Sequence, residues 1–294
     1  MKLLDGKLLA EKIRSEIAAE VKTKMLDQGI NAPHLAAVLV GEDPASQSYV
    51  SNKEKACREV GFMSSVYRYP DNISEARLLE AVRFLNEDPE IDGFIVQLPL
   101  PKQIDPNHII EAIRPSKDVD GFHPVNIGRM TLNLPAYLPA TPNGIVTLLD
   151  RYAVETEGKH VVVLGRSNIV GTPISILLSR KGKPGNATVT LCHSFTKNMK
   201  DITLQADILI VAMGKMDFVT ADMVKKDAVV IDVGMHRFED PSAKNGFRWK
   251  GDVLFDEVSR KCSAITPVPG GVGPMTIVSL LQNTLKSAKK EIIW

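Results

Sequence analysis

The spacing of hydrophobic residues in the first half of the chain predicts helices that alternate with strands. Apolar residues separated by charged ones recur at every fourth position, at Leu9, Ile13, Ile17, Val21 and Met25. This spacing is typical of an amphipathic helix. Short apolar runs predict strands at 34–40, 64–69 and 93–98, and helical spacing predicts helices at 46–60 and 75–85. The alternation predicts a parallel sheet with helices on both faces.

The second half begins with a different pattern and then returns to this alternation. Residues 105–142 contain many prolines and few long apolar runs, which predicts an irregular crossover. A helix is predicted at 143–152, followed by strands at 160–164, 187–192, 207–212 and 228–233 and a last helix at 276–289. We therefore expect an α/β protein of two lobes with a hinge near residue 140, the last helix returning to the first lobe.

The composition is that of a globular protein with balanced charge. The chain has 294 residues, of which 44% are hydrophobic, and 36 Lys and Arg residues against 35 Asp and Glu residues give a formal charge of +1. This balance provides no positive field that would attract phosphates, so we expect no nucleic-acid partner and no membrane partner. No apolar run approaches the roughly 20 residues needed to cross a bilayer.

The N-terminus and the cysteines indicate a cytoplasmic protein. Charged residues interrupt positions 1–7 before the core of a signal peptide could form. Cys57, Cys192 and Cys262 are single cysteines without close pairing, which argues against a disulfide framework or a zinc ribbon. We expect a reduced protein that stays in the compartment where it is made.

A glycine turn follows the predicted strand at 160–164 and leads into a helix, from Gly165 to Gly171. In a Rossmann site such a turn lets the backbone approach a phosphate, and the free amides of the helix start attract negative charge. The spacing departs from G-x-G-x-x-G, because Ser167 occupies the middle position and Gly171 comes one residue late. The turn predicts a nucleotide site, with a purely structural β-α turn as the alternative. A nucleophile elbow fits poorly, since Ile169 stands where that motif needs glycine.

The end of the next predicted strand distinguishes NAD from NADP. An NAD site usually carries Asp or Glu about 20 residues after the glycines, bonded to the ribose 2′-hydroxyl. Here the strand ends at His193 and Ser194 without a carboxylate, and Arg166 in the turn offers a guanidinium to a 2′-phosphate. These features favour NADP. The alternative for Arg166 is an exposed turn residue that binds no ligand.

The first lobe offers a second set of polar candidates. Tyr49 and Lys53 lie four residues apart in a predicted helix and therefore share one face. Gln97 ends a predicted strand, where ligands of open α/β sheets gather. Asp118 and Asp120 lie in a predicted loop. Each also has a structural interpretation, since a helical lysine is usually solvated and loop carboxylates usually form Asx turns.

Motifs for metal or Walker-type chemistry are missing from the sequence. There is no glycine-lysine loop of the Walker type, no H-E-x-x-H motif and no pair of histidines at ligand spacing. We therefore expect no metal site.

Six motifs connect the candidates in one order along the chain. They are SQSYVSNK at 46–53, QLPLP at 97–101, KDVDGF at 117–122, TPNG at 141–144, GRSNIVG at 165–171 and PVPGGVGPMT at 267–276. Through these motifs the chain closely resembles the bifunctional methylenetetrahydrofolate dehydrogenase/cyclohydrolase family over nearly its whole length. Each motif alone is a weak signal, but six in this order at the right separations are highly specific.

The resemblance implies two consecutive reactions. The methylene bridge of 5,10-methylenetetrahydrofolate gives a hydride to NADP, and water then converts the resulting 5,10-methenyl cation to 10-formyltetrahydrofolate. Because the substrate nitrogens stabilise the developing cation, the first step needs alignment more than an acid. The second step needs proton transfers, for which a lysine with a lowered pKa is suited.

For the first lobe the resemblance implies catalytic and substrate-binding roles. Lys53 would carry the proton transfers of the hydrolytic step, and Gln97 would hold its amine in place. Tyr49 would pack against the folate and orient it. Asp120 would accept hydrogen bonds from the donor edge of the pterin.

For the second lobe the resemblance implies a cofactor site and a loop beside the substrate. The implied NADP-binding residues are Gly165, Arg166, Ser167, Ser194, Gly234 and Met235. The loop residues Pro269, Gly270 and Gly271 would lie beside both the substrate and the nicotinamide, where small residues allow a close approach.

The implied organisation is an N-terminal α/β substrate lobe and a Rossmann-type doubly wound parallel-sheet lobe with a cleft between them. The first lobe would comprise residues 1–140 and the helix 275–294, and the second residues 141–274. A homodimer is implied as well. Two departures from the family pattern are an apparent insertion at 181–186, beside the expected adenosine end of the cofactor, and Ala140 in place of a frequent cysteine. Lys181 or Lys183 of the insertion would add a cation there.

Two other functions compete with this interpretation. One is another two-lobed NADP dehydrogenase, of the shikimate or amino-acid type, against which the motifs of the first lobe argue. The other is a folate-binding or regulatory protein without turnover. The joint presence of Lys53, Gln97 and Asp120 argues against that second alternative.

Overall fold

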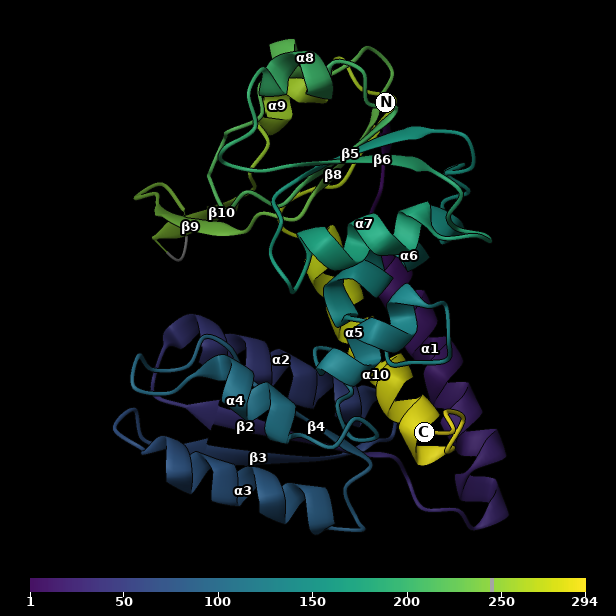
Figure 1. The fold of residues 1–294 in the computed structure, drawn as a ribbon, viewed down its shortest axis with the longest axis vertical. Helices are drawn as coiled ribbons and strands as arrows, with labels where there is room; N and C mark the ends of the chain where they lie inside the picture. Colours follow the sequence, from purple (N-terminus) through teal and green to yellow (C-terminus); the bar gives the residue numbers. More distant parts are fainter. Residues whose placement is uncertain (244–245) are drawn as a thin grey trace. The chain divides into compact units, whose positions relative to one another are not determined.

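The computed structural model describes residues 1–243 and 246–294, and these residues divide into two compact units (Figure 1). The first unit consists of residues 11–140 and 277–294, and the second of residues 1–10 and 141–276. Each unit is described below by itself.

Two long helices contribute residues to both units. They are α1 (Gly6–Lys24) and α10 (Val272–Ala288). Residues 1–10 belong to the second unit, whereas the expected division placed them in the first lobe. The physical reason is that strand β1 (Lys2–Leu3) pairs in parallel with strand β11 (Ala264–Ile265) of the second unit's sheet.

A three-stranded parallel sheet forms the centre of the first unit, in the order β3-β2-β4. Its strands are β2 (His34–Val40), β3 (Met63–Tyr69) and β4 (Gly93–Val96). Every residue of the central strand β2 is buried, as expected for a parallel strand covered on both faces. Figure 1 shows helix α2 (Pro44–Glu59) on one side of this sheet and helix α3 (Glu75–Glu87) on the other. These elements confirm the predicted alternation.

The segment 105–142 is not the irregular crossover that its prolines suggested. It contains helix α4 (Pro106–Ala112) and helix α5 (Pro124–Thr131), each with a proline in its first turn. Proline fits there, because its missing N–H would have no partner in the helix and its fixed φ is helical. The preceding residues Asp105 and His123 each accept a backbone N–H and cap the helix. The prediction was wrong because it took helix-starting prolines for breaks.

A six-stranded parallel sheet forms the centre of the second unit, in the order β1-β11-β8-β7-β5-β6. The four predicted strands are present as β5 (His160–Leu164), β6 (Thr188–Cys192), β7 (Ile208–Val211) and β8 (Val229–Asp232). Strands β6 and β7 lie on opposite sides of β5. The strand order therefore reverses at β5, because the chain continues to β6 on one side and to β7 on the other. Doubly wound sheets bind ligands at such a topological switch point.

Shorter elements complete the two units. They are the 3-10 turns Leu26–Gln28 and Ala221–Met223, helices α6 (Ala140–Arg151), α7 (Gly171–Ser179), α8 (Met199–Thr203) and α9 (Phe255–Val258), and the antiparallel strands β9 (His236–Glu239) and β10 (Phe247–Lys250). The hairpin of β9 and β10 was not predicted from the sequence. Within the described part of the chain, no helix combines the length and the hydrophobicity that spanning a membrane requires.

Candidate active site

Lys53 lies buried in the first unit between a glutamine and a tyrosine. It belongs to helix α2 and is 5% exposed. Its Nζ donates a hydrogen bond to Gln97 Oε1 at 3.2 Å and lies 4.7 Å from the centroid of the Tyr49 ring. Gln97, directly after β4, donates from its Nε2 to the Leu98 carbonyl oxygen at 2.6 Å, which orients its amide with Oε1 toward the lysine. The structure thus brings together three residues that the sequence singled out.

Burial and a neighbouring carboxylate together set the charge of the Lys53 amine. Burial lowers the pKa of Lys53, because removal from water disfavours the ammonium form. The carboxylate of Asp120 has the opposite, smaller effect and raises the pKa of Lys53. Burial likewise raises the pKa of Asp120, and the charge of Lys53 lowers it. The two groups therefore titrate as a coupled pair. An amine in this environment can exchange a proton closer to neutral pH than an exposed lysine can.

Asp118 builds the turn that presents Asp120. The Asp118 side chain is 1% exposed, and its carboxylate accepts the backbone N–H of His123 at 2.7 Å and the side-chain amide of Asn126 at 2.8 Å. Burial raises the pKa of Asp118 to about 7. Asp118 therefore has the structural role that loop carboxylates usually have, that of holding a turn. Asp120 instead interacts with the charge of Lys53.

The turn also depends on a glycine and on the last helix. Gly121 has a φ of +76°, and a Cβ there would lie 2.6 Å from the carbonyl carbon of Leu138. This position therefore needs glycine. Asn283 of α10 donates to the carbonyl oxygens of Val119 and Leu138, each at 2.9 Å, and ties both sides of the turn together. These contacts fix the backbone on either side of Asp120.

The glycine turn after β5 packs so closely against neighbouring backbone that two of its positions admit only glycine. Gly165 has a φ of +108°, and a Cβ there would lie 2.1 Å from the Ala212 carbonyl oxygen. A Cβ at Gly171 would lie 1.9 Å from the Gly165 carbonyl oxygen, so both positions need glycine. Helix α7 begins at Gly171, and Ser167 Oγ accepts the N–H of Val170 at 3.2 Å. These residues fit the phosphates of a dinucleotide.

Arg166 lies beside the residues that follow β6. Leu164 of β5 pairs with Cys192 of β6, so the segments after the two strands are neighbours. The guanidinium carbon of Arg166 lies 5.9 Å from the centroid of the Phe195 ring, within the range of a cation–π contact. Phe195 is 79% exposed and directly follows the exposed Ser194. Phe195 was not among the residues proposed from the sequence, where its position directly after Ser194 was the only usable signal.

The apparent insertion at 181–186 lies at the other end of the strands from the glycine turn. It precedes β6, whose first residue pairs with His160 at the start of β5. The five residues of β6 place its start roughly 13 Å from its end. Lys183 lies 3.8 Å from the carboxylate of Glu157, at that same starting end. This placement argues against the expectation that Lys181 or Lys183 adds a cation beside the adenosine end of the cofactor.

The remaining candidates follow the carboxyl ends of β8 and β11, and they are Gly234, Met235, Pro269, Gly270 and Gly271. The Gly234 N–H donates to Asp232 Oδ1 at 2.9 Å, whereas Met235 is 49% exposed. The Gly270 carbonyl accepts the N–H of Lys7 at 2.8 Å. Because the strands are parallel, these residues share one edge of the sheet with the glycine turn.

Comparison with known proteins identifies the family. The model of the catalytic domain of tetrahydrofolate dehydrogenase/cyclohydrolase matches residues 4–120, and the model of its NAD(P)-binding domain matches residues 139–292. The chain belongs to the tetrahydrofolate dehydrogenase/cyclohydrolase family. The resemblance inferred from the six motifs is thereby confirmed, and a dehydrogenase of the shikimate or amino-acid type is excluded.

Relatives of this family match over nearly their full length. The bifunctional protein FolD of Porphyromonas gingivalis is 60% identical to this chain over 98% of the chain and 97% of the relative. The crystal structure of the bifunctional FolD enzyme of Campylobacter jejuni has a TM-score of 0.92 and 47% identity, covering 99% of this chain and all of the other. The Trypanosoma brucei enzyme, crystallised with NADP and an inhibitor, has a TM-score of 0.93 and 38% identity, covering 98% and 97%.

Proposed function

We propose that this protein catalyses both reactions of its family with NADP as the cofactor. It oxidises 5,10-methylenetetrahydrofolate to the 5,10-methenyl cation and hydrolyses that cation to 10-formyltetrahydrofolate, within one-carbon metabolism. The observation that carries the proposal is the buried Lys53 amine, held by Gln97 and coupled to Asp120. A protein that only bound folate would gain nothing from a desolvated lysine, whereas a catalyst of proton transfer needs one.

The hydrolytic step defines what Lys53 has to do. Water adds to the bridging carbon, and its oxygen becomes the formyl oxygen. Of its two protons, one ends on the N5 nitrogen as the carbon–nitrogen bond breaks, and the other is released to solvent. The Lys53 amine, with its lowered pKa, takes part in these transfers. The hydrogen bond from Nζ to Gln97 Oε1 keeps the amine at one position during the reaction.

Asp120 and Tyr49 serve to bind and orient the folate. A carboxylate is an acceptor of hydrogen bonds, and the amino and ring N–H groups of a pterin form a row of donors that matches it. The Tyr49 ring already lies against the Lys53 amine, so a folate ring packed on the tyrosine would be held beside the proton-transferring group. Binding and chemistry in the first unit thus use one cluster of side chains.

The residues of the second unit hold and align the cofactor. NADP supplies the hydride acceptor when it is bound. The glycine turn and the start of helix α7 receive its phosphates, Arg166 and Ser194 meet the 2′-phosphate, and Gly234 and Met235 flank the nicotinamide end. Gly270 and Gly271 of the loop after β11 are small, and their size would allow the backbone to come close to a bound ligand.

The preference for NADP is expected to depend on Arg166. We expect the wild type to favour NADP over NAD by at least about tenfold in kcat/KM, because a guanidinium–phosphate contact contributes roughly 1.5–3 kcal/mol. Arg166→Ala should erode this preference mainly through NADP. Both cofactors are measured with both proteins at one moderate ionic strength, since salt screens the contact.

Lys183→Ala is the matched control for this experiment. Its side chain is 79% exposed and pairs with Glu157 at the opposite end of the strands, so it should leave the ratio of NADP to NAD unchanged. Equal use of NAD by the wild type, or an equal loss with both cofactors in Arg166→Ala, would remove Arg166 from this role.

The protein is further proposed to act as a homodimer in the cytoplasm, with the first unit binding folate and the second NADP. The cytoplasmic location is supported by Cys57, Cys192 and Cys262, which are all free and buried thiols. Light scattering of the purified protein should give twice the mass of the chain, and a monomer would contradict the dimer.

The proposed function is tested with the purified wild type and 5,10-methylenetetrahydrofolate. Formation of NADPH and of the methenyl compound, followed separately in absorbance, reports the dehydrogenase. Loss of the methenyl absorbance without cofactor reports the cyclohydrolase. Binding of folate without either signal would support the non-catalytic alternative.

A further inference from the structure

A fully buried carboxylate lies behind the loop that follows β7. Asp252 Oδ2 accepts the backbone N–H of Met213 at 2.6 Å and of Gly214 at 2.9 Å. Asp252 Oδ1 accepts the N–H of Lys215 at 2.9 Å and faces His236 Nε2, its fourth donor, at 2.7 Å. Burying a carboxylate away from water costs free energy unless hydrogen-bond donors such as these surround it. Three consecutive amides therefore take their position from one side chain.

The same carboxylate supports the segment that follows β8. A Cβ on Gly234 would lie 2.4 Å from Asp252 Oδ1, so Gly234 packs directly on this group. A second buried carboxylate, Asp232, accepts the N–H of Gly234 and the N–H of Asp252, each at 2.9 Å, on its Oδ1. Its Oδ2 accepts the N–H of Val253 at 3.0 Å. Asp232 thus holds the backbone of Asp252. Asp252 in turn contacts two loops, the first at 213–217 after β7 and the second at 233–235 after β8.

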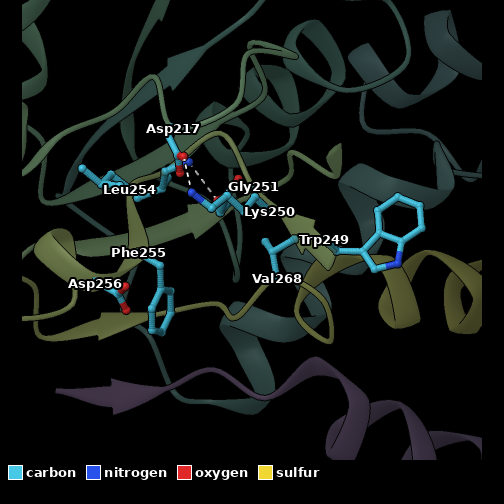
Figure 2. A pocket seen from close by; sticks show the side chains of 10 residues that line it. Asp217, Trp249, Lys250, Gly251, Leu254, Phe255, Asp256 and Val268 are labelled. Atoms are coloured by element: carbon cyan, nitrogen blue, oxygen red, sulfur yellow. Dashed lines mark hydrogen bonds and ion pairs between the residues drawn. The ribbon is translucent and has the colours of Figure 1, made fainter. Parts of the chain in front are cut away.

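The C-terminal end of the first loop, at Asp217, is also held by hydrogen bonds and an ion pair. The Asp217 N–H donates to the Gly251 carbonyl at 3.1 Å, and the Asp217 carboxylate pairs with Lys250 Nζ at 2.6 Å. Figure 2 shows these three residues together at the wall of a pocket, with the ion pair drawn as a dashed line. The loop from 213 to 217 is therefore held along its length by the segment 250–252.

Both loops belong to the edge of the sheet where the cofactor is proposed to bind. Ala212, which precedes the first loop, has its carbonyl oxygen 2.1 Å from where a Gly165 Cβ would stand. The second loop contains Gly234 and Met235. We propose that Asp252 is a positioning residue for the cofactor, touching no ligand but fixing the backbone that receives it. This inference rests on the proposed function, since it assumes that NADP binds at this edge.

A carboxylate is the group that this arrangement requires. All four neighbours are donors, and only an acceptor with two oxygens can satisfy them together. An asparagine has the same shape, but its NH₂ would face either the Met213 and Gly214 amides or the Lys215 amide and His236. Asp252→Asn therefore releases part of the loop without opening a cavity, and ligand sites are sensitive to shifts of about 0.5 Å.

The test compares Asp252→Asn with the wild type as full-length protein. Calorimetric titration should show NADP binding weakened by about tenfold or more, and the KM for NADP should rise further than kcat falls. Amide hydrogen exchange at 213–215 should become faster, which reports the positioning directly. The cyclohydrolase reaction uses no hydride acceptor and should stay within about twofold of the wild-type rate.

Two further variants separate positioning from stability. Val258→Ala removes a buried side chain from the core of the same unit and lowers thermal stability, but should leave NADP binding and the exchange at 213–215 unchanged. His236→Ala removes one of the four donors and should weaken NADP binding severalfold, which keeps the test decisive if Asp252→Asn does not fold.

The outcomes distinguish this inference from the proposed function. NADP binding by Asp252→Asn that matches the wild type, or a loss equal to that of Val258→Ala at the same drop in Tm, would overturn the role of Asp252. If the wild type itself bound no NADP, the proposed function would fail instead.

Discussion

Replacing Lys53 by methionine is expected to slow the hydrolysis of methenyltetrahydrofolate by about 10²–10⁴-fold, because a positioned proton-transfer group contributes this much. Methionine keeps the length and the apolar stem of the buried side chain, so the fold should survive. The dehydrogenase rate should fall less than the cyclohydrolase rate, since hydride transfer depends on the alignment of the reactants more than on proton transfer. Circular dichroism confirms the fold, and methenyl absorbance gives the rate. A rate above a tenth of the wild type would remove Lys53 from the chemistry.

Lys55→Met is the matched control for this variant. Lys55 lies on the same helix, is 71% exposed at its side chain and pairs with Glu59 across one helical turn. Its replacement changes the charge of the protein by the same amount and should leave both activities as they are. A loss in this control would point to a general effect of charge.

Lys53→Arg separates proton transfer from electrostatic support. The guanidinium stays charged at all working pH values and cannot exchange a proton. If Lys53 transfers protons, arginine should not restore hydrolysis. Recovery to near the wild-type rate would instead assign the lysine a purely electrostatic role.

The strands with several buried residues could be predicted from the sequence, and the shortest ones could not. Strands such as β2 and β5 show as apolar runs because parallel strands are buried on both faces. Strands β1 and β11 have two residues each, which is too short for any periodicity. They belong to the sheet through pairing with distant parts of the chain, and no local pattern reports that.

The candidate site was predictable in so far as each residue sits at a recognisable local position. Lys53 shares a helix face with Tyr49, and Gln97 directly follows a strand, so both could be proposed before their contact was known. The roles of Asp118 and Asp252 could not be assigned, because each acts by accepting backbone amides that three-dimensional folding brings to it. An aspartate that organises a loop and one that binds a ligand look alike in sequence.

Asp120→Ala is expected to weaken the binding of a folate analogue by about ten- to hundredfold, because a hydrogen bond to a charged group contributes roughly 1.5–3 kcal/mol. NADP binding should not change, since Asp120 belongs to the first unit and the proposed cofactor residues to the second. Calorimetric titration with both ligands measures this. Glu80→Ala, at an exposed carboxylate of α3, is the control. Equal losses for the two ligands would show that Asp120 supports the structure.

The same substitution should also move the pH dependence of hydrolysis, in a direction that the structure fixes. Burial lowers the pKa of Lys53, and the Asp120 carboxylate raises it. Once the carboxylate is gone, burial acts with less opposition and the pKa of Lys53 falls further. The limb of the cyclohydrolase profile that reports Lys53 should therefore shift to lower pH in Asp120→Ala, and also in Asp120→Asn, which removes the charge but keeps the size. A limb that stays in place, or that moves to higher pH, would show that the charge of Asp120 does not control the amine.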